Sequence, residues 1–148
     1  MLTIYNIKVS ISTSGSGDSA SYVEFGDGIE NISEALNEVV HQYQFISNGG
    51  FAKNHVTGAA PAWTLTGRRI MGDAAQDYIF GNKYAFDTAR QSSMKVEYTD
   101  SSSGSPIKKG FTVPCTFCNL QEFSGAATDD SAISMELRFD GKPTPTAA

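Results

Sequence analysis

Residues 133–140 read Ile133-Ser134-Met135-Glu136-Leu137-Arg138-Phe139-Asp140, a strict alternation of apolar and polar side chains. Successive side chains of a β-strand point to opposite faces. This segment therefore predicts a strand with one face on a core and the other towards water or a neighbour. The same alternation recurs over residues 94–99 and 111–117. Three such segments favour an antiparallel β scaffold.

Other segments around these three also have strand character. Within one of them, Trp63 and Leu65 are predicted to face the core, and Gly67 marks a bulge or a close backbone approach. Residues 12–21 are rich in Gly and Ser and predict a flexible connection, and residues 100–106 have the composition of a turn. The full set of predicted strands is 4–11, 22–25, 61–71, 92–99, 107–121 and 132–140.

One segment has clear helical signals. Asp73 can cap a helix together with Gln76 three residues on, an apolar stripe follows, and Gly81 can end it. We therefore predict one flanking α-helix near residues 73–80. The fold class is mainly β, with two packed antiparallel sheets in a sandwich- or barrel-like arrangement.

The region from 29 to 60 is harder to assign. Apolar residues between Ile29 and Tyr43 recur at helical spacing, with Asp27 and Glu30 as a potential capping box, while Val39, His41, Tyr43 and Phe45 alternate as in a strand. Periodicity by itself slightly favours a helix. Residues 47–60 are rich in Gly, Asn and Ala and predict a loop that docks either on another molecule or back on its own domain.

No set of residues converges on a catalytic or metal centre. A nucleophile needs an oriented base, and His41 and His55 lack any spacing that marks such a pair. Cys115 and Cys118 lie in strand-like sequence, where positions three apart point to opposite faces, so we interpret them as structural thiols. We expect no enzyme, no catalytic residue, no metal and no cofactor.

Bulk composition limits the partners. The chain has 148 residues, enough for one domain over residues 1–148, and a formal net charge of −5. Proteins hold DNA mainly through Lys and Arg, so this charge disfavours tight nucleic-acid binding. No stretch approaches the roughly 20 apolar residues of a membrane span, and the N-terminus lacks the pattern of a secretion signal. The tail over about 141–148 is predicted to be flexible.

Several segments, in order, resemble the major tail tube proteins of tailed bacteriophages, as found in siphophages. They are the run from Gly28 to Val40, the Gly-rich segment after it, Val56-Thr57-Gly58, Trp63 to Arg69, Gly72 to Ile79, and the late strand from Ile133 to Lys142. The resemblance covers about residues 26–143. It implies two packed antiparallel sheets with the helix at 73–80, and it implies a strand over residues 36–45, so we adopt the strand there.

The resemblance also implies a function. Subunits of this family form hexameric rings that stack into a hollow tube through which DNA passes without specific binding. It implies as partners other copies of the chain, a tape measure protein inside the tube, and tail-tip and tail-terminator proteins. It places the protein in the virion tail, assembled in the host cytoplasm. The segment before Trp63 is implied to reach a neighbouring subunit, and the interface residues are Asn48, Gly49, Gly50, Phe51, Ala52, Lys53, Asn54 and Val56.

The main alternative is a monomeric β-sandwich binding module, for example one for carbohydrate, with Trp63 and the tyrosines as stacking platforms. Alternation of Trp63 with Leu65 argues that Trp63 belongs to the core instead. A hydrolase ranks last because no nucleophile-base spacing supports it.

Overall fold

The computed structural model describes residues 1–14 and 21–147 of the chain. Most of the connection predicted over residues 12–21 therefore lies outside the described residues. The elements are η1 (Ile4–Asn6), β1 (Lys8–Ser12), β2 (Tyr22–Glu24), β3 (Ile29–Ala35), β4 (Glu38–Gln44), η2 (Ile46–Asn48), β5 (Ala52–Ala59), β6 (Ala62–Arg68), α1 (Ala74–Gly81), η3 (Asp87–Arg90), β7 (Gln91–Asp100), β8 (Ile107–Gln121), β9 (Ala132–Phe139) and β10 (Thr144–Ala147).

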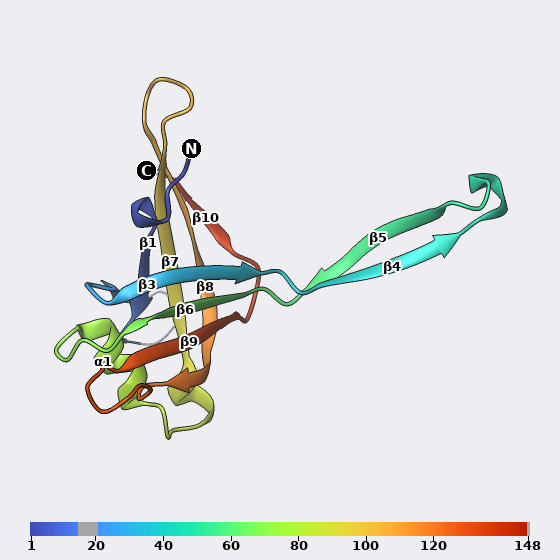
Figure 1. The fold of residues 1–148 in the computed structure, drawn as a ribbon. Coiled ribbons are helices and arrows are strands. Elements are labelled where there is room, and N and C mark those ends of the chain that lie inside the picture. The colour runs from blue at the N-terminus through green and yellow to red at the C-terminus, as the bar shows by residue number, and fades with distance from the viewer. Residues whose placement is uncertain (15–20, 148) are drawn as a thin grey trace.

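The strands form one large antiparallel sheet and one small one. The large sheet has the order β2-β1-β7-β8-β9-β6-β3, with β10 paired to β8 outside this path, and β4 pairs with β5 in a separate two-stranded sheet. Strand β8 links two layers, since its first part pairs with β7 and β10 and its last part with β9. Figure 1 shows these layers crossing, with β1 and β7 behind β3, β6 and β9. The predicted fold class is confirmed, although the sheet does not close into a barrel.

The core lies between the two layers. The apolar faces of the three alternating segments all enter it, as does Trp63, which is 6% exposed. Its indole Nε1 donates a hydrogen bond to Glu34 Oε2 at 3.1 Å, so the ring's polar atom is satisfied although its body is buried. The core residues from these strands are Met94, Val96, Val113, Cys115, Phe117, Ile133, Met135 and Leu137.

Helix α1 begins as its signals predicted, but Gly81 is its last helical residue and Asn82 is the C-cap. Asp73 is the N-cap, and its Oδ2 accepts a hydrogen bond from the backbone N of Gln76 at 3.2 Å. The Gln76 side chain is buried and holds the preceding segment instead of reaching back to Asp73. Its Oε1 accepts from the backbone N of Ile70 at 2.9 Å, and its Nε2 donates to the carbonyl of Arg68 at 3.1 Å. The helix is thereby tied to the end of β6.

Gly67 lies at the predicted close approach. A Cβ atom there would be 1.8 Å from the carbonyl oxygen of Gly28, which itself accepts a hydrogen bond from Arg68 N at 2.7 Å. The β3–β6 register also shifts between Ile29 and Asn31, opposite this position. Only a residue without a side chain fits there.

Residues 29–45 form two strands and no helix. The strand adopted for residues 36–45 is confirmed as β4, and the preceding residues form β3, so the helical spacing of the apolar residues was misleading. Residues of β3 pair along β6 from Ile29↔Gly67 to Ala35↔Ala62, and this ladder overrides local preference.

Two other predictions were wrong. The first strand does not span 4–11, because residues 4–6 form η1 and β1 begins only at Lys8. In η1, Asn6 Nδ2 donates to Thr3 Oγ1 at 2.7 Å. Such local side-chain bonds offer the chain an alternative to the hydrogen bonds of a β-strand. Residues 47–60 are not a loop, since 52–59 form strand β5. Their Gly, Asn and Ala content hid the strand, which depends on its pairing with β4.

The C-terminal residues have a partner in this fold. Residues 144–147 form β10, which pairs with β8 in the register Thr144↔Thr112 to Ala147↔Lys109. Pro145 lies in the middle of this short strand and has no N–H to donate, which is tolerated only on an edge. The flexibility predicted for residues 141–148 stays a prediction about the protein in solution.

Candidate assembly surface

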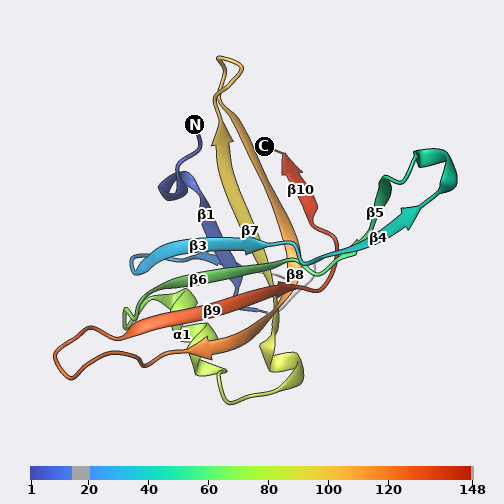
Figure 2. The same cartoon turned by 45° about the vertical axis from the view of Figure 1, so that its right-hand side comes forward.

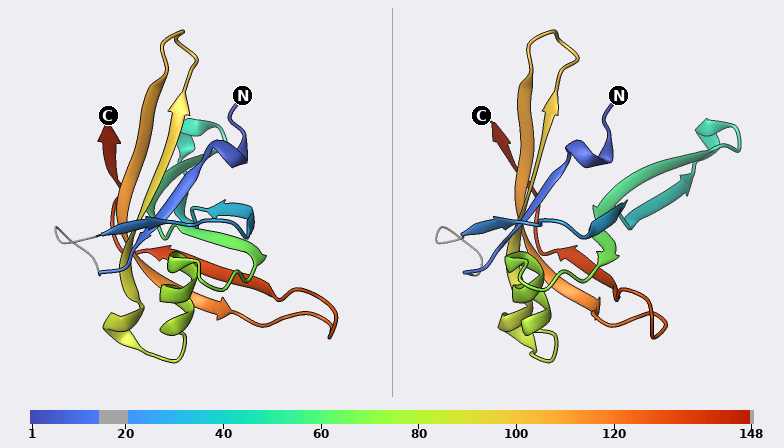
Figure 3. Two further views of the ribbon diagram at one scale, coloured as in Figure 1. Left: turned by 90° about the vertical axis from the view of Figure 1, so that its left-hand side faces the viewer. Right: turned by 60° about the vertical axis from the view of Figure 1, so that its left-hand side comes forward.

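A long hairpin stands out from the body. We call β4, β5 and the turn between them (residues 38–59) the arm. Figures 1 and 2 show the arm extending well away from the two layers, as does the right-hand view of Figure 3. Every residue of β4 and β5 is exposed. The arm therefore has no core of its own.

The base of the arm is held by backbone geometry. Asn37 has φ +49° and its Nδ2 donates to the carbonyl of Ala60 at 3.0 Å, while Ala60 N donates to the carbonyl of Leu36 at 3.0 Å. These bonds connect the β3–β6 ladder to the β4–β5 ladder. The arm is thus a continuation of one hairpin whose first half is packed and whose second half is not.

One face of the arm is aromatic and basic. The register pairs His41 with His55 and Tyr43 with Lys53. The rings of His41 and Tyr43 are stacked with centroids 6.5 Å apart, and those of Tyr43 and Phe45 are stacked at 5.8 Å. The ring of His55 meets Tyr43 edge-on at 5.7 Å. We call this set, His41, Tyr43, Phe45, His55 and Lys53, the aromatic face.

The opposite face is smaller and partly apolar. Val40 lies opposite Val56, and Gln42 Nε2 donates to Asn54 Oδ1 at 3.3 Å. The register shifts between Val39 and Val40, where the Thr57 hydroxyl donates to the carbonyl of Val39 at 3.5 Å. Such a bulge increases the local twist of the hairpin. Both faces therefore present apolar side chains to solvent.

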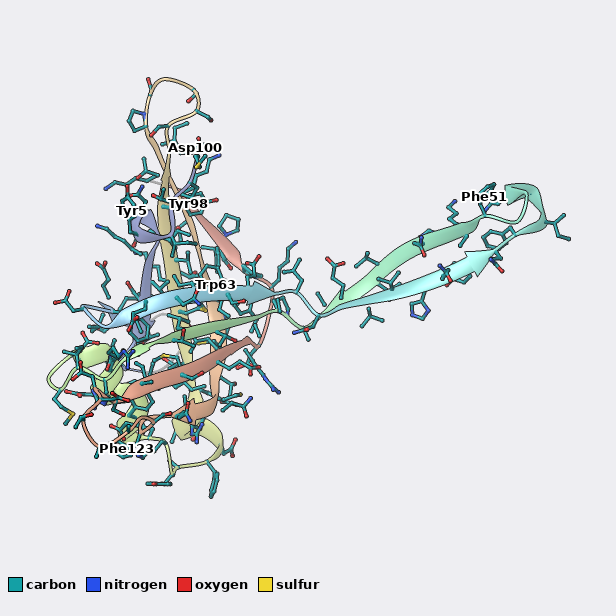
Figure 4. The ribbon with its side chains drawn as sticks, in the orientation of Figure 1. Tyr5, Phe51, Trp63, Tyr98, Asp100 and Phe123 are labelled. Atoms are coloured by element: carbon teal, nitrogen blue, oxygen red, sulfur yellow. The ribbon has the colours of Figure 1, made fainter. Side chains whose placement is uncertain are left out.

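The tip carries the most exposed apolar side chains of the arm. Ile46 is 102% exposed and Phe51 79%, and Figure 4 shows Phe51 at the far end of the hairpin. Gly49 and Gly50 adopt φ +61° and +89°, values that favour glycine, and complete the turn after η2. A monomeric protein rarely exposes so many large apolar side chains together, so the tip is a candidate interaction surface.

The predicted interface residues all lie on the second half of the arm. Asn48 ends η2, Gly49, Gly50 and Phe51 form the turn, and Ala52, Lys53, Asn54 and Val56 belong to β5. Their contact with another subunit stays a prediction. Sequence reasoning missed the first half, where Val39, Tyr43 and Phe45 are also exposed. The alternation over residues 39–45 was the available signal.

A second exposed aromatic group lies beside helix α1. Lys83 Nζ is 4.2 Å from the ring centroid of Phe123 and 5.1 Å from that of Tyr84, and Figure 4 shows Phe123 at the end of the body away from Asp100. Both rings are exposed, as is Phe86. The same lysine pairs with Glu122 Oε1 at 2.6 Å. This end of the molecule is therefore both apolar and ionic.

Arg69 anchors that ionic group. Its side chain is 7% exposed, and its guanidinium pairs with Glu122 Oε2 and with Asp77 Oδ1, each at 2.8 Å. Burial acts to raise the pKa of Glu122, but the hydrogen bonds from Lys83 and Arg69 outweigh it, so the pKa is lowered. Arg68 pairs within the chain as well, with Glu30 Oε1 at 3.0 Å.

The side chains that could act as nucleophiles, bases or metal ligands do not meet in one site. Burial raises the pKa of the Cys115 thiol to about 12, and burial also raises that of Cys118. His41 and His55 lie on the arm, far from both cysteines. Among the described residues no three His, Cys, Asp or Glu side chains cluster as a metal site would require. None of the helices described is long and apolar enough to cross a membrane.

The fold is that of several tail tube structures. The chain matches a chain in the tail of an empty gene transfer agent particle with C6 symmetry, with a TM-score of 0.65 and 11% identity, covering 99% of this chain and 100% of that one. It matches the SPP1 tail tube with a TM-score of 0.63 and 14% identity, covering 100% and 80%. No protein-family model and no curated protein match the sequence.

Contractile systems share the fold too. A chain in the tube-terminating cap of the anti-feeding prophage has a TM-score of 0.63 and 17% identity, with 100% of this chain and 92% of that chain covered. A chain in the sheath-tube complex of an extracellular contractile injection system has a TM-score of 0.61 and 16% identity, with coverage of 100% and 93%. The expected likeness to tail tube proteins is confirmed at the level of the fold.

Proposed function

We propose that this chain is a structural subunit of a virion tail, which self-assembles into hexameric rings stacked as a hollow tail tube. The observation that supports this most is the arm, which exposes apolar side chains on both faces and makes no core with its own body. A lone two-stranded hairpin is at best marginally stable in water. Contact with other copies would cover it.

The fold supports the same proposal. The matching chains come from tail tubes and tube-sheath assemblies, and one of those tails has C6 symmetry. A ring of six would bring together sheet edges that one copy leaves open. Natural β proteins cover or blunt such edges, because an open edge can pair with other chains. The proposal includes assembly in the bacterial host cytoplasm, and it assigns no enzymatic activity.

The charge fits a conduit. Six copies at −5 carry about −30 in total, and a negative wall repels DNA so that it slides without adhering. The proposed partners are other copies of the chain, a tape measure protein within the tube, tail-tip and tail-terminator proteins, and DNA in transit.

The test is electron microscopy of negatively stained, concentrated protein, with size-exclusion chromatography beside it. Rings or hollow tubes of uniform diameter are expected for the wild-type chain. Phe51→Asp should fold but form no tubes, because it places a charge at the apolar tip of the arm. Ser47→Asp, which adds the same charge at the same tip and keeps Phe51, is the matched control and should assemble. Tubes of normal yield from Phe51→Asp would remove the arm tip from the mechanism.

The alternative of a carbohydrate-binding module loses its main platform, because Trp63 is buried in the core and hydrogen-bonded to Glu34. A clear hit on a glycan array by a chain that stays monomeric would favour it over the tube.

A further inference from the structure

The body carries a groove on its open side. It lies where the sheet fails to close, between η1 and β1 of one layer and β3 of the other, and has a volume of about 530 Å³. Pockets that hold drug-sized ligands span roughly 300–1,000 Å³, so this groove has room for a few large side chains. We call it the β1–β3 groove.

Apolar side chains form its walls, and acids dominate its rim. Ile4 and Ile7 lie on one side, Ile29 and Ile32 on the other, with Leu65 also in the lining. Three carboxylates, Glu24, Asp27 and Glu30, line the groove against one lysine, Lys8. Glu30 is paired with Arg68, which leaves Glu24 and Asp27 as exposed acids at the rim.

The backbone beside the groove is also open. Strand β3 is the last strand in the sheet order, and among the described residues its ladder partner is β6 alone. An exposed edge of seven residues without proline is a template for further contacts. Within the large sheet the other edges are weaker templates, because β2 has three residues and β10 contains Pro145.

The groove and the arm lie at opposite ends of one hairpin. Strand β3 starts at the groove with Ile29 and ends with Ala35, next to the base of the arm. Seven residues span about 23 Å in a strand, and β4 continues outward over another seven. Figure 1 shows β4 and β5 extending in the direction in which β3 runs. Since the groove lies at the start of β3, the arm points away from it. An arm in this direction does not reach the groove of its own chain.

We propose that the β1–β3 groove is the receptor for the arm of a second copy, with Tyr43 and Phe45 inserted between Ile7 and Ile29 and Lys53 facing the acidic rim. This rests on the proposed self-assembly and names the surface that the arm contacts. The aromatic face supplies large apolar rings and a lysine, while the groove supplies apolar walls and an excess of carboxylates. A contact between two different surfaces of one chain is heterologous, and it generates rings or open arrays.

The first experiment separates donor from receptor. Phe45→Asp spoils the aromatic face and leaves the groove intact, and Asn31→Trp fills the groove at an exposed position and leaves the arm intact. Each variant alone should be monomeric in analytical ultracentrifugation. A mixture of the two should form a one-to-one dimer that does not grow, because only one productive contact remains.

The outcomes distinguish this inference from the proposed function. A mixture that stays monomeric, at concentrations at which the wild-type chain forms tubes, overturns the groove as receptor and leaves the tube standing. A wild-type chain that stays monomeric together with a monomeric mixture overturns both. Binding of a soluble ligand that Asn31→Trp abolishes, with normal tubes from that variant, assigns the groove to the ligand instead.

The second experiment exchanges charges. Lys53→Glu, and separately Glu24→Lys with Asp27→Lys, should each raise the critical concentration for assembly by roughly two- to fivefold, the range for exposed ion pairs. The triple variant should return close to the wild-type value, because the charges are complementary again. Lys108→Glu makes the same charge change on β8 and should have no such effect. Additive losses in the triple variant would contradict the pairing.

Discussion

Gly67 and Gly28 approach so closely that a Cβ atom on Gly67 would lie 1.8 Å from the carbonyl oxygen of Gly28. This contact joins β6 to the start of β3, next to the β1–β3 groove. The obstacle to any side chain is backbone, which cannot move aside as a flexible side chain would.

Gly67→Ala should therefore lower the free energy of unfolding by about 1–3 kcal/mol, the usual cost of overpacking. Urea unfolding measures the change. Gly81→Ala is the control: a Cβ there has no neighbour within 4 Å, and at the end of α1 alanine is no worse than glycine. An unchanged midpoint for Gly67→Ala would mean that the two strands separate more easily than this geometry implies.

Asp73→Ala should lower the free energy of unfolding by about 0.5–2 kcal/mol, because it removes the N-cap of α1. The loss should fall towards the upper end, since Asp73 Oδ1 also accepts a hydrogen bond from Gly26 N at 3.0 Å. Asp73→Asn keeps one acceptor oxygen, which suffices for the capping bond, but its NH2 group cannot accept the second bond. It should therefore lose less stability than Asp73→Ala in thermal unfolding. Equal losses in both variants would contradict the capping bond as the main contribution of Asp73.

Glu122 should make stability depend on pH in the acid range. Its pKa is lowered in the folded chain, so the unfolded chain takes up its proton first as the pH falls. The stabilisation is complete above the ordinary carboxyl pKa and is lost as the pH falls through the lowered value. In Glu122→Gln, the free energy of unfolding measured in urea should depend less steeply on pH below about 4.5. Glu24→Gln, at an exposed carboxylate, is the control, and an equal slope in both variants would contradict the role of the Arg69–Glu122–Lys83 group.

The thiols should resist modification in the native protein. The thiolate is the reactive form, and burial raises the pKa of Cys115 to about 12 and raises that of Cys118 as well. A chromogenic disulfide reagent at neutral pH should label both sites in urea, and in the native chain Cys115 least of all. Fast labelling of native Cys115 would contradict its burial.

The arm should exchange its amide hydrogens far faster than the body in the free chain. Its ladder lies in solvent on both faces, and such segments open at low free energy. Hydrogen exchange with mass spectrometry should show residues 38–59 unprotected in the monomer and protected in tubes, while β7 and β9 are protected in both. An arm that remains unprotected in tubes would contradict its role as a contact surface.

The predicted strands that face a core were largely decided by local sequence. Alternation over residues 94–99, 111–117 and 133–140 directs the apolar residues to one face, because the side-chain period of a strand is two, and all of them except Tyr98 lie in the core or pack against it. The start of α1 was equally readable, since Asp73 caps the helix within its first turn. The close approach at Gly67 was visible because only glycine permits it.

The arm was decided by tertiary structure. Lys53, Asn54 and Gly58 have the composition of a loop, and their strand exists because β4 supplies the hydrogen-bonding partners. Such pairing is non-local, so no window of sequence around β5 contains it. The β1–β3 groove is more remote still, as Ile7, Ile29 and Leu65 meet only when the two layers cross. Sequence by itself determined which side chains are buried in a strand, through a period that is local. Tertiary structure decided which apolar side chains remain exposed. A strand face is buried only where a second layer covers it, and β4 and β5 extend beyond the layers.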